Sequence, residues 1–405
     1  MKNILIGQSG GPTAVINSSL AGVIDAGLRS EKIDKIYGMV GGIEGLLNKD
    51  LTELSEKMGE NELRLLKQTP SSFLMSCRKK LKDYKDDEET YVKIFDILKD
   101  YNISHFFYIG GNDSMDTVDK LSRYAAETGS DITFAGVPKT IDNDLPLTDH
   151  TPGYGSAAKF VANTVHALAQ DTAVYKMPSV IILEIMGRNA GWLTAAASLG
   201  NSENVYGTDI ICLPERPFDA EKFLSKVERN ISLGKFPIIS ISEGIKDKNG
   251  KYISEGVSLK GEADGFAHAN LGGVGRVIEK LISDNLKIKT RTIELSTLQR
   301  CFSPMASMCD VEEAFLAGSS AAQLSFDGQS AFMPCFNRVS DNPYKIEISA
   351  NPVSQIANLE RSVPDNMISA DGMGITPEFT SYARPLILGE PNLIYKDGVL
   401  EFLVR

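Results

Sequence analysis

The chain has 405 residues, of which 42% are hydrophobic and 23% are charged, and its formal net charge is −11. This composition is typical of a water-soluble globular protein with room for two domains. The acidic balance argues against non-specific binding to nucleic acid or to an anionic membrane surface. Five scattered cysteines without a CxxC pair favour a reducing cytoplasm over a disulfide framework. No segment is long enough to span a bilayer, and the short apolar run at the N-terminus does not indicate a signal sequence.

Two predicted strands in the first part of the chain end in glycine pairs. A strand over 3–7 runs into Gly10-Gly11, a strand over 105–109 runs into Gly110-Gly111, and a helix follows each turn. Such a turn can present backbone N–H groups to a phosphate, because no Cβ blocks the approach. Taken alone, either glycine pair could instead belong to a plain strand-to-helix turn that binds no phosphate. Neither turn matches the Walker pattern or GxGxxG.

A third predicted strand, 132–137, ends in the heptapeptide Pro-Lys-Thr-Ile-Asp-Asn-Asp at 138–144. In an open parallel sheet, ligands bind outside the carboxyl ends of the strands. If the chain stays extended there, Asp142 and Asp144 lie on one side and Asn143 on the other. A solvated turn rich in Asn and Asp is the alternative for this heptapeptide by itself. Three successive strand ends of this kind favour a binding site.

The second half of the chain continues the alternation of strands and helices. A strand over 179–185 ends in Met186-Gly187-Arg188, where an arginine before a helix is well placed for a phosphate. A strand over 236–242 is followed by Glu243, and an irregular stretch over 69–78 could bring its final arginine to an anion. Strands that alternate with helices indicate an α/β fold with mostly parallel sheets. The C-terminal segment gives no clear element pattern.

The order and spacing of these motifs, as far as Leu298-Gln299-Arg300, resemble the phosphofructokinase family. PKTIDND at 138–144 and MGR at 186–188 are the specific motifs, whereas the glycine pairs alone are not. The resemblance implies two Rossmann-like three-layer α/β lobes with mostly parallel sheets and the active site in the cleft between them. The expected lobes are residues 1–153 on the phosphoryl-donor side and 154–405 on the sugar-phosphate side. The chain is expected to cross back to the first lobe near 300–360.

Two positions within this resemblance bear on the phosphoryl donor. Relatives that use ATP have glycine where this chain has Asp113 and Lys139. A carboxylate at Asp113 would oppose the charge of a nucleotide α-phosphate. An ammonium at Lys139 could reach pyrophosphate and offset charge on the transferring group, unless it is an exposed lysine at a strand tip. The chain therefore resembles the pyrophosphate-dependent branch, which implies reversible phosphoryl transfer from pyrophosphate to the 1-hydroxyl of fructose 6-phosphate, giving fructose 1,6-bisphosphate.

The resemblance also implies roles for individual residues. Asp142 would be the general base that takes the proton from the sugar 1-hydroxyl, with Thr140 beside it. Arg78 would stabilise the transferring group, unless it is only a surface arginine. The donor phosphates would contact Gly10, Gly11, Gly110, Gly111 and Lys139. The sugar phosphate would contact Thr140, Asp142, Asp144, Met186, Gly187, Arg188, Glu243, Arg291, Thr297 and Arg300. Mg²⁺ is expected, because adjacent phosphate oxygens need a hard cation, and Asn112 and Asp144 would lie on its side of the site.

Three positions depart from the family pattern. Asn112 stands where many relatives have aspartate, Thr297 where histidine or tyrosine is usual, and Ser179 where bacterial ATP-dependent enzymes have arginine. These departures leave sedoheptulose 7-phosphate open as an acceptor. An ATP-dependent 6-phosphofructokinase and a sugar-phosphate-binding regulatory subunit without catalysis are the alternative functions. A homodimer or higher homo-oligomer is expected, because contacts like that of Arg291 often come from a neighbouring subunit.

Overall fold

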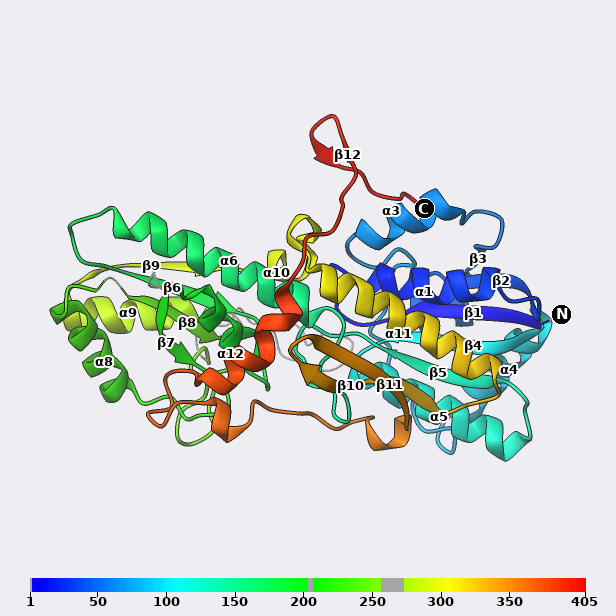
Figure 1. Ribbon diagram of the computed structural model, residues 1–405. Helices are drawn as coiled ribbons and strands as arrows, with labels where there is room; N and C mark the ends of the chain where they lie inside the picture. The colour runs from blue at the N-terminus through cyan, green and yellow to red at the C-terminus, as the bar shows by residue number, and fades with distance from the viewer. Residues whose placement is uncertain (1, 203–206, 236, 256–272) are drawn as a thin grey trace.

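Two β-sheets organise the chain in the computed structural model, which describes residues 2–202, 207–235, 237–255 and 273–405. The first sheet has seven strands in the order β11-β10-β5-β4-β1-β2-β3, and the second has four in the order β7-β8-β6-β9. Figure 1 shows the sheets in two lobes that lie side by side. The predicted class, two α/β lobes with mostly parallel sheets, is confirmed.

The first sheet is parallel in its centre and antiparallel at its edges. Its strands are β1 (Lys2–Gln8), β2 (Ile33–Met39), β3 (Leu51–Glu53), β4 (Ile103–Gly110), β5 (Thr133–Pro138), β10 (Phe332–Asp341) and β11 (Tyr344–Pro352). β1, β2, β4 and β5 pair in parallel, whereas β3 and β11 run antiparallel to β2 and β10. β10 joins the parallel part through Phe332 beside Ala135 of β5. The carboxyl ends of β1, β4 and β5 therefore meet at one edge.

Helices cover both faces of this sheet. One face is covered by α1 (Ile16–Leu28), α3 (Glu60–Gln68) and α11 (Met308–Phe326), and the other by α2 (Gly42–Leu47), α4 (Glu88–Asp100) and α5 (Asn112–Thr128). Successive side chains of β4 alternate between the two cores, because residues of a strand point to opposite faces in turn. Phe106 and Tyr108 pack with α4 and α5, and Phe107 and Ile109 pack with α1 and α11.

The second sheet also lies between two layers of helices. Its strands, β6 (Ser179–Ile185), β7 (Thr208–Cys212), β8 (Ile238–Ser242) and β9 (Lys289–Glu294), are all parallel. One face packs on α8 (Ala220–Ser232) and α9 (Val274–Leu286), and the other on α6 (Tyr154–Ala173), α7 (Trp192–Ala195), η1 (Ala196–Gly200) and α12 (Pro377–Ala383). The predicted strand over 236–242 corresponds to β8, and its first residue, Phe236, lies outside the described residues.

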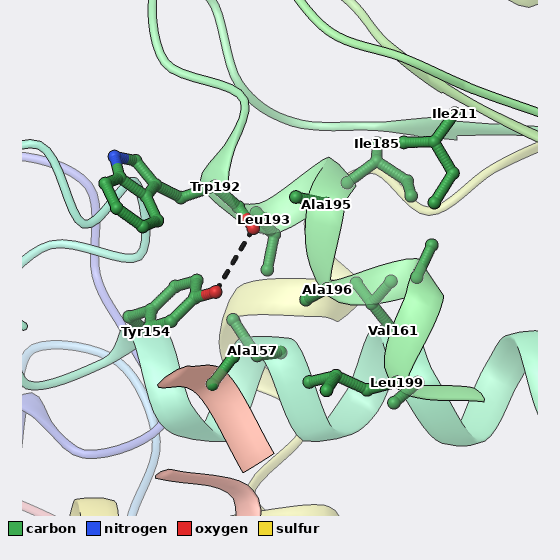
Figure 2. Packing of buried hydrophobic residues seen from close by; sticks show 14 of the residues in the cluster. Tyr154, Ala157, Val161, Ile185, Trp192, Leu193, Ala195, Ala196, Leu199 and Ile211 are labelled. Carbon is green, nitrogen blue, oxygen red and sulfur yellow. Dashed lines mark hydrogen bonds between the residues drawn. The ribbon is translucent and has the colours of Figure 1, made fainter. Parts of the chain in front are cut away.

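Small side chains allow α6 to approach the segment that follows β6. Ala157 of α6 and Ala195 and Ala196 of the facing segment belong to one buried cluster (Figure 2). The Tyr154 hydroxyl donates a hydrogen bond of 3.2 Å to the Trp192 carbonyl across this contact. The packing fixes the turn after β6, on which the predicted phosphate-binding residues lie.

The C-terminal part of the chain passes between the lobes more than once. After α11, β10 and β11 in the first lobe, the chain supplies Val363 and Phe379 to the core of the second lobe. It then returns to α3, where Gln68 Nε2 donates a 2.6 Å hydrogen bond to the Glu401 carbonyl. The remaining short elements are α10 (Leu298–Cys301), η2 (Ser303–Met305), η3 (Val353–Gln355), η4 (Asp365–Met367), η5 (Arg384–Ile387), β12 (Tyr395–Lys396) and β13 (Val399–Leu400). Among the described residues, no helix has both the length and the apolar character needed to cross a membrane.

A buried ionic cluster ties the loop after β5 to the C-terminal half. His150 Nδ1 lies 2.8 Å from Asp149 Oδ1, and His150 Nε2 lies 2.6 Å from Glu313 Oε2 on α11. Arg338 of β10 donates a 2.8 Å hydrogen bond to the same Asp149 oxygen. Burial alone would lower the pKa of His150, but the attraction and hydrogen bonds of Glu313 and Asp149 outweigh it and raise that pKa to about 9. The imidazole is therefore charged at neutral pH.

We predict that this cluster makes stability depend on pH. A histidine with a folded pKa of about 9 stabilises the fold fully below its unfolded pKa, and this contribution is lost as pH rises towards 9. Replacing His150 by Gln should therefore lower the free energy of unfolding most at pH 6, by up to about 3 kcal/mol more than at pH 9.5. Urea unfolding of both proteins across this pH range measures the difference. A difference that stays constant with pH would contradict the assignment.

Candidate active site

The carboxyl ends of five strands open into one cleft of about 850 Å³ between the lobes. The first lobe contributes the ends of β1, β4 and β5, and the second contributes those of β6 and β8. Ligands of parallel α/β sheets bind at this end of the strands. The cleft is lined by Gly10, Gly11, Pro12, Arg78, Gly111, Asn112, Asp113, Ser114, Lys139, Thr140, Ile141, Asp142, Asp144, Met186, Arg188, Asn189, Ala190, Glu243, Arg300, Asn358, Leu359 and Glu360.

Lys139 lies buried where the first lobe lines the cleft. Its backbone N–H donates a 3.0 Å hydrogen bond to the Gly110 carbonyl and so continues the pairing of β5 with β4. Its side chain is only 3% exposed, and Nζ donates a 2.7 Å hydrogen bond to the Gly11 carbonyl. Burial lowers the pKa of Lys139 to about 8, although Asp142 and Asp144 oppose this shift. Lys139 is therefore not an exposed lysine at a strand tip.

The chain is not extended through Asp142 and Asp144, so the alternation of sides that an extended stretch would give does not apply. Asn143 has a left-handed backbone with φ +53° and is fully buried. Its side-chain oxygen accepts a 3.1 Å hydrogen bond from the Thr151 N–H, and its amide nitrogen donates to the Tyr382 hydroxyl at 2.8 Å. These partners stabilise a conformation that is uncommon for residues other than glycine. Both aspartates line the cleft from this bent loop.

Three carboxyl groups of the cleft titrate near neutral pH. Burial raises the pKa of Asp142 to about 6, and the nearby Glu243 carboxylate adds to this shift while Lys139 opposes it. Burial and the charge of Asp142 raise the pKa of Asp144 to about 7. Burial also raises the pKa of Glu243 to about 7, against the hydrogen bond from the Gly187 N–H. A carboxylate whose pKa lies near the working pH can both accept and return a proton.

The two glycine turns bring the backbone close to Lys139 and to α5. Gly10 has φ +77°, and a Cβ there would lie 3.4 Å from Lys139 Nζ. A Cβ on Gly110 would lie 1.8 Å from Ser114 Oγ, so only glycine lets α5 begin directly after β4. Gly111 lines the cleft, whereas Gly110 is not among the described residues that do so.

Two side-chain oxygens in the cleft are buried without a protein partner. The Asn112 amide nitrogen donates to the Leu359 carbonyl, which orients the amide and leaves Oδ1 without a hydrogen bond among the described residues. Asp144 Oδ1 is likewise buried and unpartnered within the described chain. Buried polar atoms normally have a partner, so these oxygens indicate a place for water or a hard cation.

Asp113 lies in the first turn of α5 at the rim of the cleft. Lys80 Nζ lies 3.2 Å from its Oδ1 and donates a 3.4 Å hydrogen bond to Asn358 Oδ1. Asn358 in turn donates to Asp116 at 2.9 Å. The Asp113 carboxylate is therefore held by Lys80, and Asn358 from a distant segment holds Lys80 in turn.

The second lobe lines the cleft with the turns after β6 and β8. The Gly187 N–H lies 3.4 Å from Glu243 Oε1, and the Met186 N–H donates a 3.1 Å hydrogen bond to Gln299 Oε1. The second contact joins β6 to α10, which carries Arg300. A Cβ on Gly11 would lie 3.4 Å from Arg300 Nη1, so this arginine reaches the donor turn as well.

The structure does not bring every predicted residue into the cleft. Arg291 on β9 and Thr297 before α10 are exposed, and neither is among the described residues that line the cleft. Gly187 is also not among the described residues that line the cleft, although its N–H lies 3.4 Å from Glu243 Oε1. All the other predicted site residues, apart from Gly110, line it.

Eight lining residues were not among the predicted site residues, namely Pro12, Ser114, Ile141, Asn189, Ala190, Asn358, Leu359 and Glu360. The first five lie within two positions of a predicted site residue, so the sequence could have indicated that they lie next to the cleft. Asn358, Leu359 and Glu360 lie in a C-terminal stretch without a periodic pattern, and no sequence signal marks them. The Asn189 amide donates a 3.1 Å hydrogen bond to Glu360 Oε1 and joins the two segments.

Comparisons with known proteins agree with this geometry. The sequence profile described as Phosphofructokinase matches residues 3–324. The chain is 38% identical to pyrophosphate–fructose 6-phosphate 1-phosphotransferase of Methylococcus capsulatus, over 99% of this chain and 95% of that protein. It is 40% identical to the Xanthomonas campestris protein of the same name, over 99% and 95% of the two chains. The crystal structure of pyrophosphate-dependent phosphofructokinase from Nitrosospira multiformis has a TM-score of 0.89 at 36% identity and covers 99% of this chain and 96% of that one.

The profile spans most of the chain, and the relatives match it along nearly their whole length. The motifs that carried the resemblance in the sequence meet in one cleft of the structure. On these grounds the chain belongs to the phosphofructokinase family.

Proposed function

We propose that this protein reversibly transfers a phosphoryl group from pyrophosphate to the 1-hydroxyl of fructose 6-phosphate. The observation that carries the proposal is the buried Lys139 ammonium, which lies between the Gly11 turn and the carboxylates of Asp142 and Asp144. In this reaction the ammonium contacts the donor phosphates where the phosphoryl group is transferred. The names of the full-length relatives support the same donor and acceptor.

The cleft supplies the groups that phosphoryl transfer needs. The Asp142 carboxylate takes the proton from the sugar 1-hydroxyl as that oxygen attacks, and it returns the proton in the reverse direction. Lys139, Arg78 and Arg300 offset the negative charge on the transferring phosphoryl group. Positioning and charge stabilisation account for most of the catalysis in this class of reaction. Met186, Arg188 and Glu243 hold the sugar phosphate from the second lobe.

The contacts of Asp113 support pyrophosphate over ATP as the donor. Asp113 is held at the rim of the cleft by Lys80. A nucleotide that continued past the transferring phosphates would meet this carboxylate and the ion pair beside it. Pyrophosphate ends before that point, so it avoids the repulsion.

The donor set of the cleft fits Mg²⁺. The unpartnered oxygens of Asn112 and Asp144 are a neutral amide oxygen and a carboxylate oxygen, both of the hard type that Mg²⁺ binds. No described group of three or more His, Cys, Asp or Glu residues could hold a metal by itself, which suits an ion that takes most of its ligands from phosphates and water. When bound, the ion would neutralise phosphate charge.

Two further assignments complete the proposal. The exposed position of Arg291 on the edge strand β9 supports a homodimer or higher oligomer, in which this arginine contacts the sugar phosphate of a neighbouring chain. The five cysteines are free thiols, which supports a reducing cytoplasm as the location.

We predict activity with pyrophosphate and at most a trace of activity with ATP. Initial rates with fructose 6-phosphate and Mg²⁺, measured separately with each donor, test the proposal. Replacing Asp113 by Gly should raise kcat/KM for ATP at least about tenfold, a gain of about 1.4 kcal/mol, because it removes the repulsion. Asp119 lies on the same helix outside the cleft lining, so Asp119→Ala should leave donor preference unchanged.

Other outcomes of this assay have definite meanings. Wild-type activity with ATP alone would overturn the choice of donor. If the protein is inactive with both donors, the same rates should be measured with sedoheptulose 7-phosphate as the acceptor. Inactivity with that acceptor as well would favour a regulatory subunit. Asp142→Asn should lower kcat by about 10³-fold while sugar-phosphate binding persists, whereas a regulatory subunit would be unaffected.

We also predict a bell-shaped pH profile of kcat/KM. Activity should rise as the coupled carboxyl groups of Asp142 and Asp144 lose protons, with apparent pKa values of about 6 and about 7. It should fall as Lys139 loses its proton above its pKa of about 8. In Lys139→Arg the alkaline limb should move to higher pH, because guanidinium stays protonated. Substrate ionisation is common to both proteins, so an unmoved alkaline limb would exclude Lys139 as its source.

The metal assignment predicts a change in Mg²⁺ requirement. Asn112→Ala and Asp144→Asn should each raise the Mg²⁺ concentration for half-maximal rate by roughly tenfold or more, because each weakens an oxygen donor. Asn189→Ala is the matched control, because this amide lines the same cleft but is paired with Glu360. Titration of the rate with Mg²⁺ at saturating substrates measures the shift. Equal shifts in all three variants would argue against the assignment.

A further inference from the structure

We propose that Arg361 is the positioning residue that holds the loop of Asp142 and Asp144 in its reactive geometry. This inference rests on the function proposed above, because it assigns the loop a catalytic role. Arg361 does not line the cleft among the described residues. It acts from behind the loop, through backbone groups.

Arg361 contacts the loop at four backbone positions. Its own N–H donates a 2.7 Å hydrogen bond to the Asp144 carbonyl. Its Nη2 donates to the Asn143 carbonyl at 3.0 Å. Its Nη1 donates to the carbonyls of Thr148 and Asp149 at 2.9 and 2.7 Å. One arginine therefore binds both ends of the turn that follows Asp142.

These carbonyls need such a partner because the turn has no regular backbone pairing. Asn143 adopts a left-handed conformation, which costs free energy in a residue with a Cβ and persists only where its surroundings stabilise it. A buried carbonyl without a partner would add to that cost. The planar guanidinium can donate several hydrogen bonds in fixed directions, which an ammonium cannot do.

Trp192 of the second lobe holds the guanidinium in place. The Arg361 guanidinium lies 4.5 Å from the centre of the Trp192 ring, and Trp192 Nε1 donates a 3.0 Å hydrogen bond to the Arg361 carbonyl. Figure 2 shows Trp192 at the start of the segment that packs on α6. Tyr382 strengthens the arrangement, because its hydroxyl accepts from Asn143 and donates to the Asp149 carbonyl at 2.7 Å. The loop from the first lobe is therefore positioned against the core of the second.

The variants Arg361→Ala and Arg361→Lys test the proposal. A loop displaced by about 1 Å should lower kcat by about 100-fold. The KM for fructose 6-phosphate should change less than about threefold, because Arg188, Glu243 and Arg300 are unaffected. Arg361→Lys should fall between the wild type and Arg361→Ala, because it keeps the charge and loses the planar fork. Guanidinium ion at millimolar concentration should restore part of the rate of Arg361→Ala.

A matched control separates positioning from general stability. Arg384 donates a 3.0 Å hydrogen bond to the Leu199 carbonyl, away from the loop. Arg384→Ala should therefore leave kcat unchanged and show no response to guanidinium. Melting temperatures of all the variants monitor folding.

The single tryptophan gives a readout that does not depend on activity. Trp192 is the chain's one tryptophan, so intrinsic fluorescence reports its ring directly. Loss of the stacked guanidinium should change the emission of Arg361→Ala and leave that of Arg384→Ala at the wild-type value. A folded Arg361→Ala with changed emission and wild-type kcat would overturn the inference.

Two further outcomes also decide the matter. If Arg361→Ala does not fold, Arg361→Lys carries the test, and a wild-type kcat in that variant would overturn the inference. If the wild-type protein is inactive with every donor and acceptor, the proposed function fails and the inference fails with it. Failure of the inference alone requires an active wild type, so the two results are distinguishable.

Discussion

The burial of the Lys139 ammonium is the constraint on which the cleft depends. Moving an isolated charge out of water costs several kcal/mol, so the fold must supply partners where Lys139 enters the interior. The Gly11 carbonyl accepts its hydrogen bond, and the carboxylates of Asp142 and Asp144 attract it. The same burial acts on those carboxylates in the opposite sense, because it lowers the pKa of an amine and raises that of an acid. The result is an acid and a base with pKa values of about 8 and about 6 in one site.

The two sheets place these groups, but distant segments fix their final geometry. β1, β4 and β5 are neighbours in one sheet, so their carboxyl ends lie close together whatever the orientation of their side chains. The turn after β5, in contrast, takes its conformation from Tyr382 and Arg361, which lie more than two hundred positions along the chain. The repeated passage of the C-terminal part between the lobes brings these partners to the turn. A connection confined to one lobe could not hold the loop against Trp192.

The contrast between local pattern and contacts from distant segments explains how much could be predicted from the sequence. The strands, the alternation with helices and the glycine turns depend on local pattern, and the structure contains them. The bend at 142–144 could not be predicted, because the left-handed Asn143 depends on hydrogen bonds to Thr151 and Tyr382 that no local pattern shows. Glu360 was missed for the same reason, since it belongs to an irregular stretch that only the tertiary fold brings to the cleft. Arg291 was assigned through the family resemblance, and its position on an edge strand, outside the cleft lining of a single chain, leaves that role a proposal.

The charges of the cleft bear on the metal. Arg78, Lys139, Arg188 and Arg300 are its cations, and Asp142, Asp144, Glu243 and Glu360 are carboxylates that nearly balance them, with Asp113 paired to Lys80. A pyrophosphate and a sugar phosphate add several negative charges to this nearly neutral site. Protonation of the carboxyl groups would relieve the imbalance, but it would also remove the base that we propose at Asp142. A divalent cation relieves it without protonating Asp142, and the buried oxygens of Asn112 and Asp144 are suited to bind one. The proposed divalent cation would therefore offset the same excess of negative charge that would otherwise favour protonated carboxyl groups.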